Sequence, residues 1–447
     1  MSSSLMWFRR DLRLSDHPAL CRAAGSGEVL PVFVLDPTLI RSGGPRSTRL
    51  MASLAALQED LGGALVVRSG DPVDVIPEMA AEVDAGQVHI SAETTPYGRR
   101  RDEAVARRLS DADIRLVATG SAYAVTPGRV STGSGAPYRV FTPFRRAWEQ
   151  HGWGAPAARP EVRWLTDVAG EQLDLPDSEP AGEREALRRW DEFCATDLVA
   201  YDEMRNRPDE DRTSRMSVPL KYGEVHPRTL LADLLAHPAR HDRTGIERFE
   251  TELAWREFYA DVLWHHPRSA WHDWKDDLAD MRYDADPARI EAWRLGRTGY
   301  PFVDAGMRQL LSQGWMHNRV RMVTASFLVK DLHVWWTLGA RHFMDHLADG
   351  DVASNSHGWQ WVAGTGTDAS PYFRIFNPVA QGLRFDPSGD YVRRWIPELR
   401  HLAGAAAHEP WHADDGYREG YPARMVDHDE ERRESLARWE EVRSTRR

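Results

Sequence analysis

The chain has 447 residues, 28% of them charged, and a formal net charge of −11, which indicates a globular protein of two or three domains. Two cysteines, Cys21 and Cys194, exclude a disulfide framework and a four-cysteine iron–sulfur site, and favour a cytoplasmic location. No apolar run approaches the roughly 20 residues of a membrane helix, so we expect no membrane contact. The negative charge, taken alone, argues against a nucleic-acid partner.

The first third of the chain alternates short apolar runs with amphipathic stretches. We expect strands at residues 5–8, 29–35, 65–67, 88–91 and 114–117, and helices at 46–61, 72–83 and 99–110. This alternation predicts an α/β domain over 1–125, a doubly wound parallel sheet with helices on both faces. No Gly-x-Gly-x-x-Gly motif follows the first strand, so the usual dinucleotide fingerprint is missing.

The rest of the chain changes character twice. Residues 126–184 are rich in Pro, Gly and acidic residues and predict a linker with one ordered island at 138–148. An all-helical domain is expected over 185–447. Its helical spacing covers 185–201, 227–235, 247–265, 287–295, 303–311, 316–329, 331–347 and 429–441.

Two stretches of the helical domain, 314–322 and 349–361, mix Trp with Asn, Arg and Asp in otherwise helix-like sequence. An unpaired buried amide costs roughly 2–7 kcal/mol, so these groups either pair with one another or line a cavity for a large polar, aromatic ligand. Glu252, Trp255 and Arg256 share one helical face, which is either an exposed face or a cavity wall. The Ser and Thr cluster at 213–217 fits either a phosphate site or a helix cap.

Taken together, these motifs resemble the DNA photolyase/cryptochrome flavoproteins, most closely the class I cyclobutane pyrimidine dimer photolyases. The resemblance covers nearly the whole chain and rests on 7–13, 213–217, 255–259, 298–301, 314–322, 349–361 and 372–378. It implies light-driven DNA repair, in which photoexcited reduced FAD donates an electron that splits the cyclobutane ring of a pyrimidine dimer. The alternative is a cryptochrome-type blue-light photoreceptor that signals to a protein partner.

The resemblance also implies a bent FAD among the helices and assigns its contacts. They are Tyr201, Thr213, Ser214, Arg215, Met216, Ser217, Arg256, Asn318, Arg321, Asp349, Asp351 and Asn355. Asn355 would face N5 of the flavin, where an amide cannot release a proton and therefore favours the anionic cofactor. Asn318 and Met322 stand where a (6-4) photoproduct enzyme carries His, which favours cyclobutane dimers as the substrate. Asn355 stands where cryptochromes tend to carry Asp or Cys, which favours repair over signalling.

The resemblance implies UV-damaged DNA as the partner, and we expect a monomer without a bound metal. Glu252 would hydrogen-bond the dimer, Trp255 and Trp361 would hold it flipped out of the duplex, and Arg319 and Arg374 would contact phosphates.

Electron transfer to the flavin is implied to run along a tryptophan chain. Trp359 and Trp336 match its inner and middle members, but the outer position falls on Tyr283, where the family commonly has Trp. We expect slower or altered photoreduction, with Tyr283 as terminal donor or with Trp274 or Trp293 in its place.

An antenna chromophore is the last implied feature. Residues 96–102 resemble the members that bind 8-hydroxy-5-deazaflavin more than those that bind methenyltetrahydrofolate, with Arg49 and Glu93 as candidate contacts. Alternatively, this stretch only opens a helix.

Overall fold

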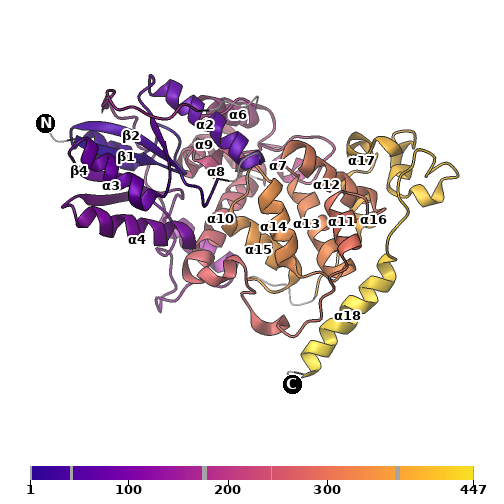
Figure 1. Cartoon of the computed structure of the whole chain (residues 1–447). Coiled ribbons are helices and arrows are strands. Elements are labelled where there is room, and N and C mark those ends of the chain that lie inside the picture. Colours follow the sequence, from indigo (N-terminus) through magenta and orange to yellow (C-terminus); the bar gives the residue numbers. More distant parts are fainter. Residues whose placement is uncertain (1–2, 41–43, 174–178, 243, 368–372, 446–447) are drawn as a thin grey trace. The chain divides into compact units, whose positions relative to one another are not determined.

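The computed structural model describes residues 3–40, 44–173, 179–242, 244–367 and 373–445. The chain forms two compact units, one of Met1–Val199 with Ser214–Pro267 and one of Ala200–Thr213 with Arg268–Arg447 (Figure 1). The functional domains that we expected, 1–125 and 185–447 with a linker over 126–184, stay a prediction. Residues 174–178 of this linker lie outside the described residues. No helix in the described part of the chain combines the length and apolar content needed to cross a bilayer.

A parallel sheet forms the centre of the first unit, as expected. Its strands are β1 (Ser3–Phe8), β2 (Glu28–Leu35), β3 (Val66–Ser69), β4 (Ala85–Ala92) and β5 (Arg115–Ser121), in the order β3-β2-β1-β4-β5. The short strand β6 (Arg163–Trp164) pairs with the start of β2. Successive side chains of a strand point to opposite faces, so β1 sends Met6 and Phe8 to one buried core and Leu5 and Trp7 to another. The sheet is therefore covered on both faces and doubly wound.

Helices of the first unit begin mostly where the sequence places a proline or a capping side chain. They are α1 (Pro18–Ala24), α2 (Pro45–Asp60), α3 (Pro72–Glu82), α4 (Pro96–Ser110), α5 (Phe141–His151), α6 (Glu183–Thr196), α8 (Ser217–Tyr222), α9 (Pro227–Ala236) and α10 (Thr244–His265). In Figure 1, α3 and α4 lie side by side along the sheet. The expected start of α4 at residue 99 was three residues late, because Thr95 caps the helix and Pro96 is its first residue.

The second unit is helical and has its own core. Its helices are α7 (Tyr201–Met204), α11 (Pro287–Arg294), α12 (Pro301–Gln313), α13 (Asn318–Ser326), α14 (Trp336–His346), α15 (Val352–Ala363), α16 (Pro378–Phe385), α17 (Asp390–Trp395) and α18 (His428–Thr445). A π-helical turn, η4 (Phe327–Asp331), follows α13. Short 3-10 turns are η1 (Pro238–Asp242), which belongs to the first unit, and η2 (Pro267–Ala270), η3 (Asp276–Leu278), η5 (Pro397–Leu399), η6 (Gly404–His408) and η7 (Pro410–His412).

Among the predicted helix starts of this unit, that of α14 differs most from our expectation. A helix beginning at residue 331 was predicted, but α14 begins at Trp336. His333 has φ +53°, in the left-handed region, which an α-helix cannot include. The chain thus turns between η4 and α14, and this turn decides where the two tryptophans at the start of α14 point.

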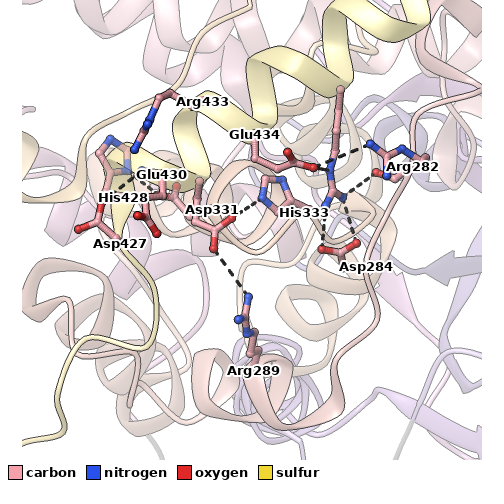
Figure 2. Close-up of polar contacts among 12 residues, drawn as sticks. Arg282, Asp284, Arg289, Asp331, His333, Asp427, His428, Glu430, Arg433 and Glu434 are labelled. Atoms are coloured by element: carbon pink, nitrogen blue, oxygen red, sulfur yellow. Dashed lines mark hydrogen bonds and ion pairs between the residues drawn. The ribbon is translucent and has the colours of Figure 1, made fainter.

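Helix α18 is fastened to the second unit by a network of ion pairs (Figure 2). His428 bonds Asp331 at the end of η4, His333 Nε2 lies 2.7 Å from a carboxylate oxygen of Glu431, and Arg438 pairs with Asp284 at 3.0 Å. Burial raises the pKa of Asp331 to about 6, although His428 acts in the opposite direction. The network holds η4 in place from one side.

The side chain of Lys330 holds η4 from within. It is buried, its Nζ donates to the carbonyl of Ala363 at 2.7 Å, and it lies 3.2 Å from the centre of the Phe373 ring. The Phe373 ring also stacks on that of Trp439 in α18, with ring centres 5.6 Å apart. Burial lowers the pKa of Lys330 well below its usual range. Lys330 therefore ties the π-helical turn to the C-terminal end of α15.

In the first unit, a buried carboxylate joins α10 to the segment that follows the sheet. Glu257 accepts the backbone N–H groups of Ala124 at 2.6 Å and Val125 at 3.0 Å, and the indole N–H of Trp148 at 3.2 Å. Burial raises its pKa from 4.5 to about 7, against the effect of these three donors. Glu257 thus fixes the helix that carries Glu252, Trp255 and Arg256.

We expect Glu257→Gln to destabilise the first unit by about 2–4 kcal/mol, because its amide NH2 would face N–H donors that need an acceptor. Because the folded pKa of Glu257 lies above 4.5, its contribution to stability is fully present below that pH and is lost as pH rises through about 7. The pH dependence of the guanidinium unfolding midpoint should flatten over this range in the variant. Glu103→Gln, at an exposed position on α4, is the control and should leave midpoint and profile unchanged.

Candidate functional site

The N-terminus of α13 presents the first group of predicted site residues. His317 caps the helix: its Nδ1 accepts the backbone N–H of Arg319 at 3.2 Å, which places the ring proton on Nε2. Burial lowers the pKa of His317 to about 3, so the ring is neutral at pH 7. Its buried Nε2 has no hydrogen-bond partner within the described part of the chain. Asn318, the first helical residue, is exposed beside it.

An ion pair joins α13 to the segment before α15. Arg321 Nη2 donates to Asp349 Oδ2 at 2.8 Å, and its Nε donates to the carbonyl of Met316 at 2.7 Å. Asp349 is only 6% exposed, and its other oxygen, Oδ1, is buried without a partner among the described residues. The structure therefore brings together two residues that sequence reasoning assigned to one cofactor.

Helix α15 carries three predicted residues on one face. Asp351 caps the helix by accepting the N–H of Ser354 at 3.0 Å, and Asn355 and Trp359 follow at intervals of four. The Asn355 amide NH2 donates to the carbonyl of Ala340 at 2.9 Å, which leaves its oxygen as the group that can accept a hydrogen bond. Trp359 is buried against α14, where a Cβ on Gly339 would come within 2.1 Å of its ring.

Predicted substrate residues of the second unit form two further pairs. Arg374 places its guanidinium 4.9 Å from the centre of the Trp361 ring. Arg319 donates to Asn206 Oδ1 at 2.6 and 3.2 Å and lies 4.4 Å from the Phe385 ring, and its Nη1 is 3.8 Å from Met322 Sδ. Asn206 has no distinctive sequence context, so sequence reasoning missed it.

The first unit holds the remaining predicted residues on α10 and before α8. On α10, Trp255 stacks on Phe141 with ring centres 3.7 Å apart, and Glu252 lies one turn earlier, half-buried. Arg256 donates to the carbonyls of Ala122 at 3.0 Å and Leu220 at 3.3 Å.

The segment that leads into α8 makes a tight turn. Arg215 adopts φ +51°, the N–H of Met216 bonds Ser214 Oγ at 3.3 Å, and Ser217 is the first residue of α8. In the second unit, Tyr201 starts α7, and Thr213 has a buried Oγ1 without a partner in the described structure.

The predicted electron-transfer residues lie in the second unit. Trp336 is fully buried and its indole N–H donates to Asp273 Oδ1 at 2.6 Å. Trp359 packs against Gly339, one turn further along α14. Burial raises the pKa of the half-buried Tyr283. Trp293 is fully buried with its ring 6.1 Å from that of Trp359, so it neighbours the inner position and does not fit the outer one.

The two candidate antenna residues have partners within the first unit. Arg49 pairs with Glu224 and donates to the carbonyl of Pro180 at 3.1 Å. Glu93 accepts the N–H groups of Thr94 at 2.7 Å and Thr95 at 3.1 Å. These contacts give both residues a structural role, and an antenna role stays a prediction.

Three buried polar atoms of the second unit test whether a large polar cofactor fits. Thr213 Oγ1, His317 Nε2 and Asp349 Oδ1 each lack a partner among the described residues. Buried polar atoms without a protein partner also occur elsewhere in the second unit, and each calls for a ligand, an ion or a water. A hydroxyl, an imidazole N–H and a carboxylate suit the phosphates, hydroxyls and N–H groups of FAD. His317 was missed at the sequence level, although its place before Asn318 marks it as a helix cap.

A doubly wound α/β unit and a helical unit with such side chains define a class of FAD-binding flavoproteins. Residues 249–441 match the family model for the FAD binding domain of DNA photolyase, and residues 4–161 match the model for DNA photolyase. The deoxyribodipyrimidine photo-lyase of Streptomyces griseus is 42% identical, and that of Escherichia coli (strain K12) is 39% identical, each over 99% of both chains. A crystal structure of a bacterial class III photolyase from Agrobacterium tumefaciens is 39% identical with a TM-score of 0.92, covering 99% of this chain and 98% of that one.

The chain therefore belongs to the DNA photolyase family. The family named from the sequence is confirmed. The narrower assignment to class I stays a prediction, since one similar structure is described as class III.

We expect Asp349→Asn to lower the FAD content of the purified protein, because a neutral amide no longer balances the charge of Arg321. The free energy of unfolding should also fall, by about 1–3 kcal/mol. The ratio of flavin to protein absorbance after gel filtration measures the first effect and denaturant unfolding the second. Glu291→Gln, which removes a surface pairing with Arg294, is the matched control. Full flavin content in Asp349→Asn would contradict the assignment.

Proposed function

We propose that this protein repairs UV-damaged DNA with light, as a deoxyribodipyrimidine photo-lyase that splits the cyclobutane ring of pyrimidine dimers. The observation that carries the proposal is the face of α15, where Asp351, Asn355 and Trp359 are aligned and Asn355 presents an amide oxygen. Full-length similarity to proteins named photo-lyases supports repair over signalling.

Different residues of this chain would hold the phosphates of the cofactor, its ribityl chain with the flavin ring, and the N5 position of that ring. Thr213 and the 214–217 turn supply hydroxyl and N–H groups for the phosphates, in the manner of helix N-termini. Arg321 and Asp349 provide a fixed charge pair for the flavin ring and the ribityl chain. Asn355 offers an acceptor, and no acidic proton, to the flavin N5. When bound, reduced FAD supplies the light absorption and the transferred electron.

The family resemblance assigns the substrate contacts, and the surroundings of each residue within its own unit support the assignment. Arg374 over Trp361 combines a cation with an aromatic platform, which suits a flipped pyrimidine pair next to a phosphate. Trp255, held by its stack on Phe141, offers a second rigid indole. Glu252 would hydrogen-bond the dimer, and Arg319 would contact the DNA backbone, a contact that positions without reading sequence.

Several finer features belong to this proposal. They are a monomeric, cytoplasmic protein with domains at 1–125 and 185–447, and an antenna chromophore, 8-hydroxy-5-deazaflavin in preference to methenyltetrahydrofolate. The visible absorption spectrum of the purified holoprotein distinguishes the two antennae from each other and from FAD alone.

We expect the chemically reduced holoprotein to restore the ultraviolet absorbance of thymine in an irradiated oligonucleotide under blue light. Glu252→Ala should lower the dimers repaired per absorbed photon several-fold, because one hydrogen bond to the developing charge is lost. Glu103→Ala, at an exposed position in the same unit, should repair at the wild-type rate. Absence of any light-dependent repair by the reduced wild-type protein would contradict the proposed function.

A further inference from the structure

Two consecutive tryptophans stand at the start of α14 in different environments. Trp336, the first residue of the helix, is 0% exposed, whereas Trp335, its N-cap residue, is 38% exposed. Their ring centres are 6.3 Å apart with planes at 69°, an edge contact. The extended backbone of Trp335, φ −60° and ψ 132°, turns its side chain outward while keeping this contact. The buried indole thus has a direct aromatic neighbour that reaches solvent.

A carboxylate lies beside both indoles. Trp336 Nε1 donates to Asp273 Oδ1 at 2.6 Å. Burial raises the pKa of Asp273, while hydrogen bonding from the indoles of Trp336 and Trp335 lowers it. A negative group at this place stabilises positive charge on either ring, by an interaction that is strong because the site is half-buried. It can also accept the Nε1 proton of Trp336.

Tyr283, where the family commonly places its outer tryptophan, is less suited to the task. Among the described residues it makes no ring contact with Trp336, and its hydroxyl has no hydrogen-bonded acceptor. Burial raises its pKa, and so does the negative charge of Asp273, which acts on the phenol without a hydrogen bond between the two side chains. Oxidation of a neutral phenol requires that its proton leave to a base, whereas an indole can be oxidised first and lose its proton later.

We propose that Trp335 is the terminal electron donor of the photoreduction chain and takes the role that sequence comparison gives to Tyr283. The inference rests on the proposed function and on the tryptophan chain that the family resemblance implies, with Trp359 and Trp336 as its inner members. Trp336 passes one electron to the oxidised Trp359, and its Nε1 proton moves to Asp273. An electron from Trp335 then refills Trp336, which recovers its proton from Asp273. Trp335 passes its own Nε1 proton through the freed carboxylate of Asp273 to water, and is restored by a hydrogen atom from a thiol in the solvent.

The test uses the full-length holoprotein with oxidised FAD, under blue light with a thiol reductant. Loss of the oxidised-flavin absorbance gives the photoreduction rate, and transient absorption gives the lifetime of the indole radical. We expect Trp335→Phe to slow photoreduction several-fold and shorten the radical lifetime, because the hole stays on Trp336 and recombines. Tyr283→Phe should match the wild type, as should Trp411→Phe, a control at a distant η7 position, whereas Trp336→Phe should be slower still. Asp273→Asn should shift the early radical spectrum from the neutral indolyl to the protonated form.

Wild-type photoreduction in Trp335→Phe, or a loss in Tyr283→Phe alone, overturns the inference; so does wild-type photoreduction in Trp336→Phe. Flavin content and circular dichroism of each variant confirm that cofactor and fold are retained. The chemically reduced Trp335→Phe protein should repair dimers at the wild-type rate. Failure of reduced wild-type protein to repair refutes the proposed function and leaves the photoreduction result to stand by itself.

Discussion

The pairing of Arg321 with Asp349 is the interaction on which the helical half of the site depends. It connects the start of α13 to the segment that caps and begins α15, so the face of Asp351, Asn355 and Trp359 is held against α13. Removing two charges from water is unfavourable unless further hydrogen bonds compensate. Arg321 has such a bond to the Met316 carbonyl, and the free oxygen of Asp349 suits a cofactor. The partly satisfied pair therefore fits the cofactor-binding role that we propose for it.

A second constraint acts at the other end of α15. Lys330 is buried, bonds the carbonyl of Ala363 and lies over Phe373, whose ring stacks on Trp439. The π-helical turn that carries Lys330 is in turn fixed by the ion pairs of α18 in Figure 2. The C-terminal helix therefore supports α15, which bears the proposed cofactor face, although α18 contributes none of the predicted cofactor residues itself.

Electron supply to the buried indoles depends on how α14 begins. The left-handed His333 ends the π-helical turn, and the chain then reaches Trp335 extended and Trp336 helical. The same turn exposes the ring of Trp335, buries that of Trp336 and sets both beside Asp273. In our proposal, Trp335 compensates for the departure from the family pattern at Tyr283.

Strand–helix alternation, proline helix starts and the spacing of the long motifs were enough to predict the sheet, most helices and the family. These are local or period-based signals, which the sequence carries directly. The face shared by Glu252, Trp255 and Arg256, and that of Asp351, Asn355 and Trp359, also follow from helical periodicity. The late start of α14, the contact of Arg319 with Asn206 and the burial of Trp293 could not be predicted, because each depends on residues distant in sequence.

By itself, the sequence determined which chemical groups are available and which of them share a helix. Only the tertiary structure decided which of those groups meet. Arg321 is neutralised by Asp349, and Trp335 contacts Trp336. The amide NH2 of Asn355 donates to the carbonyl of Ala340, which leaves the amide oxygen as an acceptor. The physical reason is that hydrogen bonds and ring contacts act over only a few ångströms. Segments that are distant in sequence come that close only when the helices pack together.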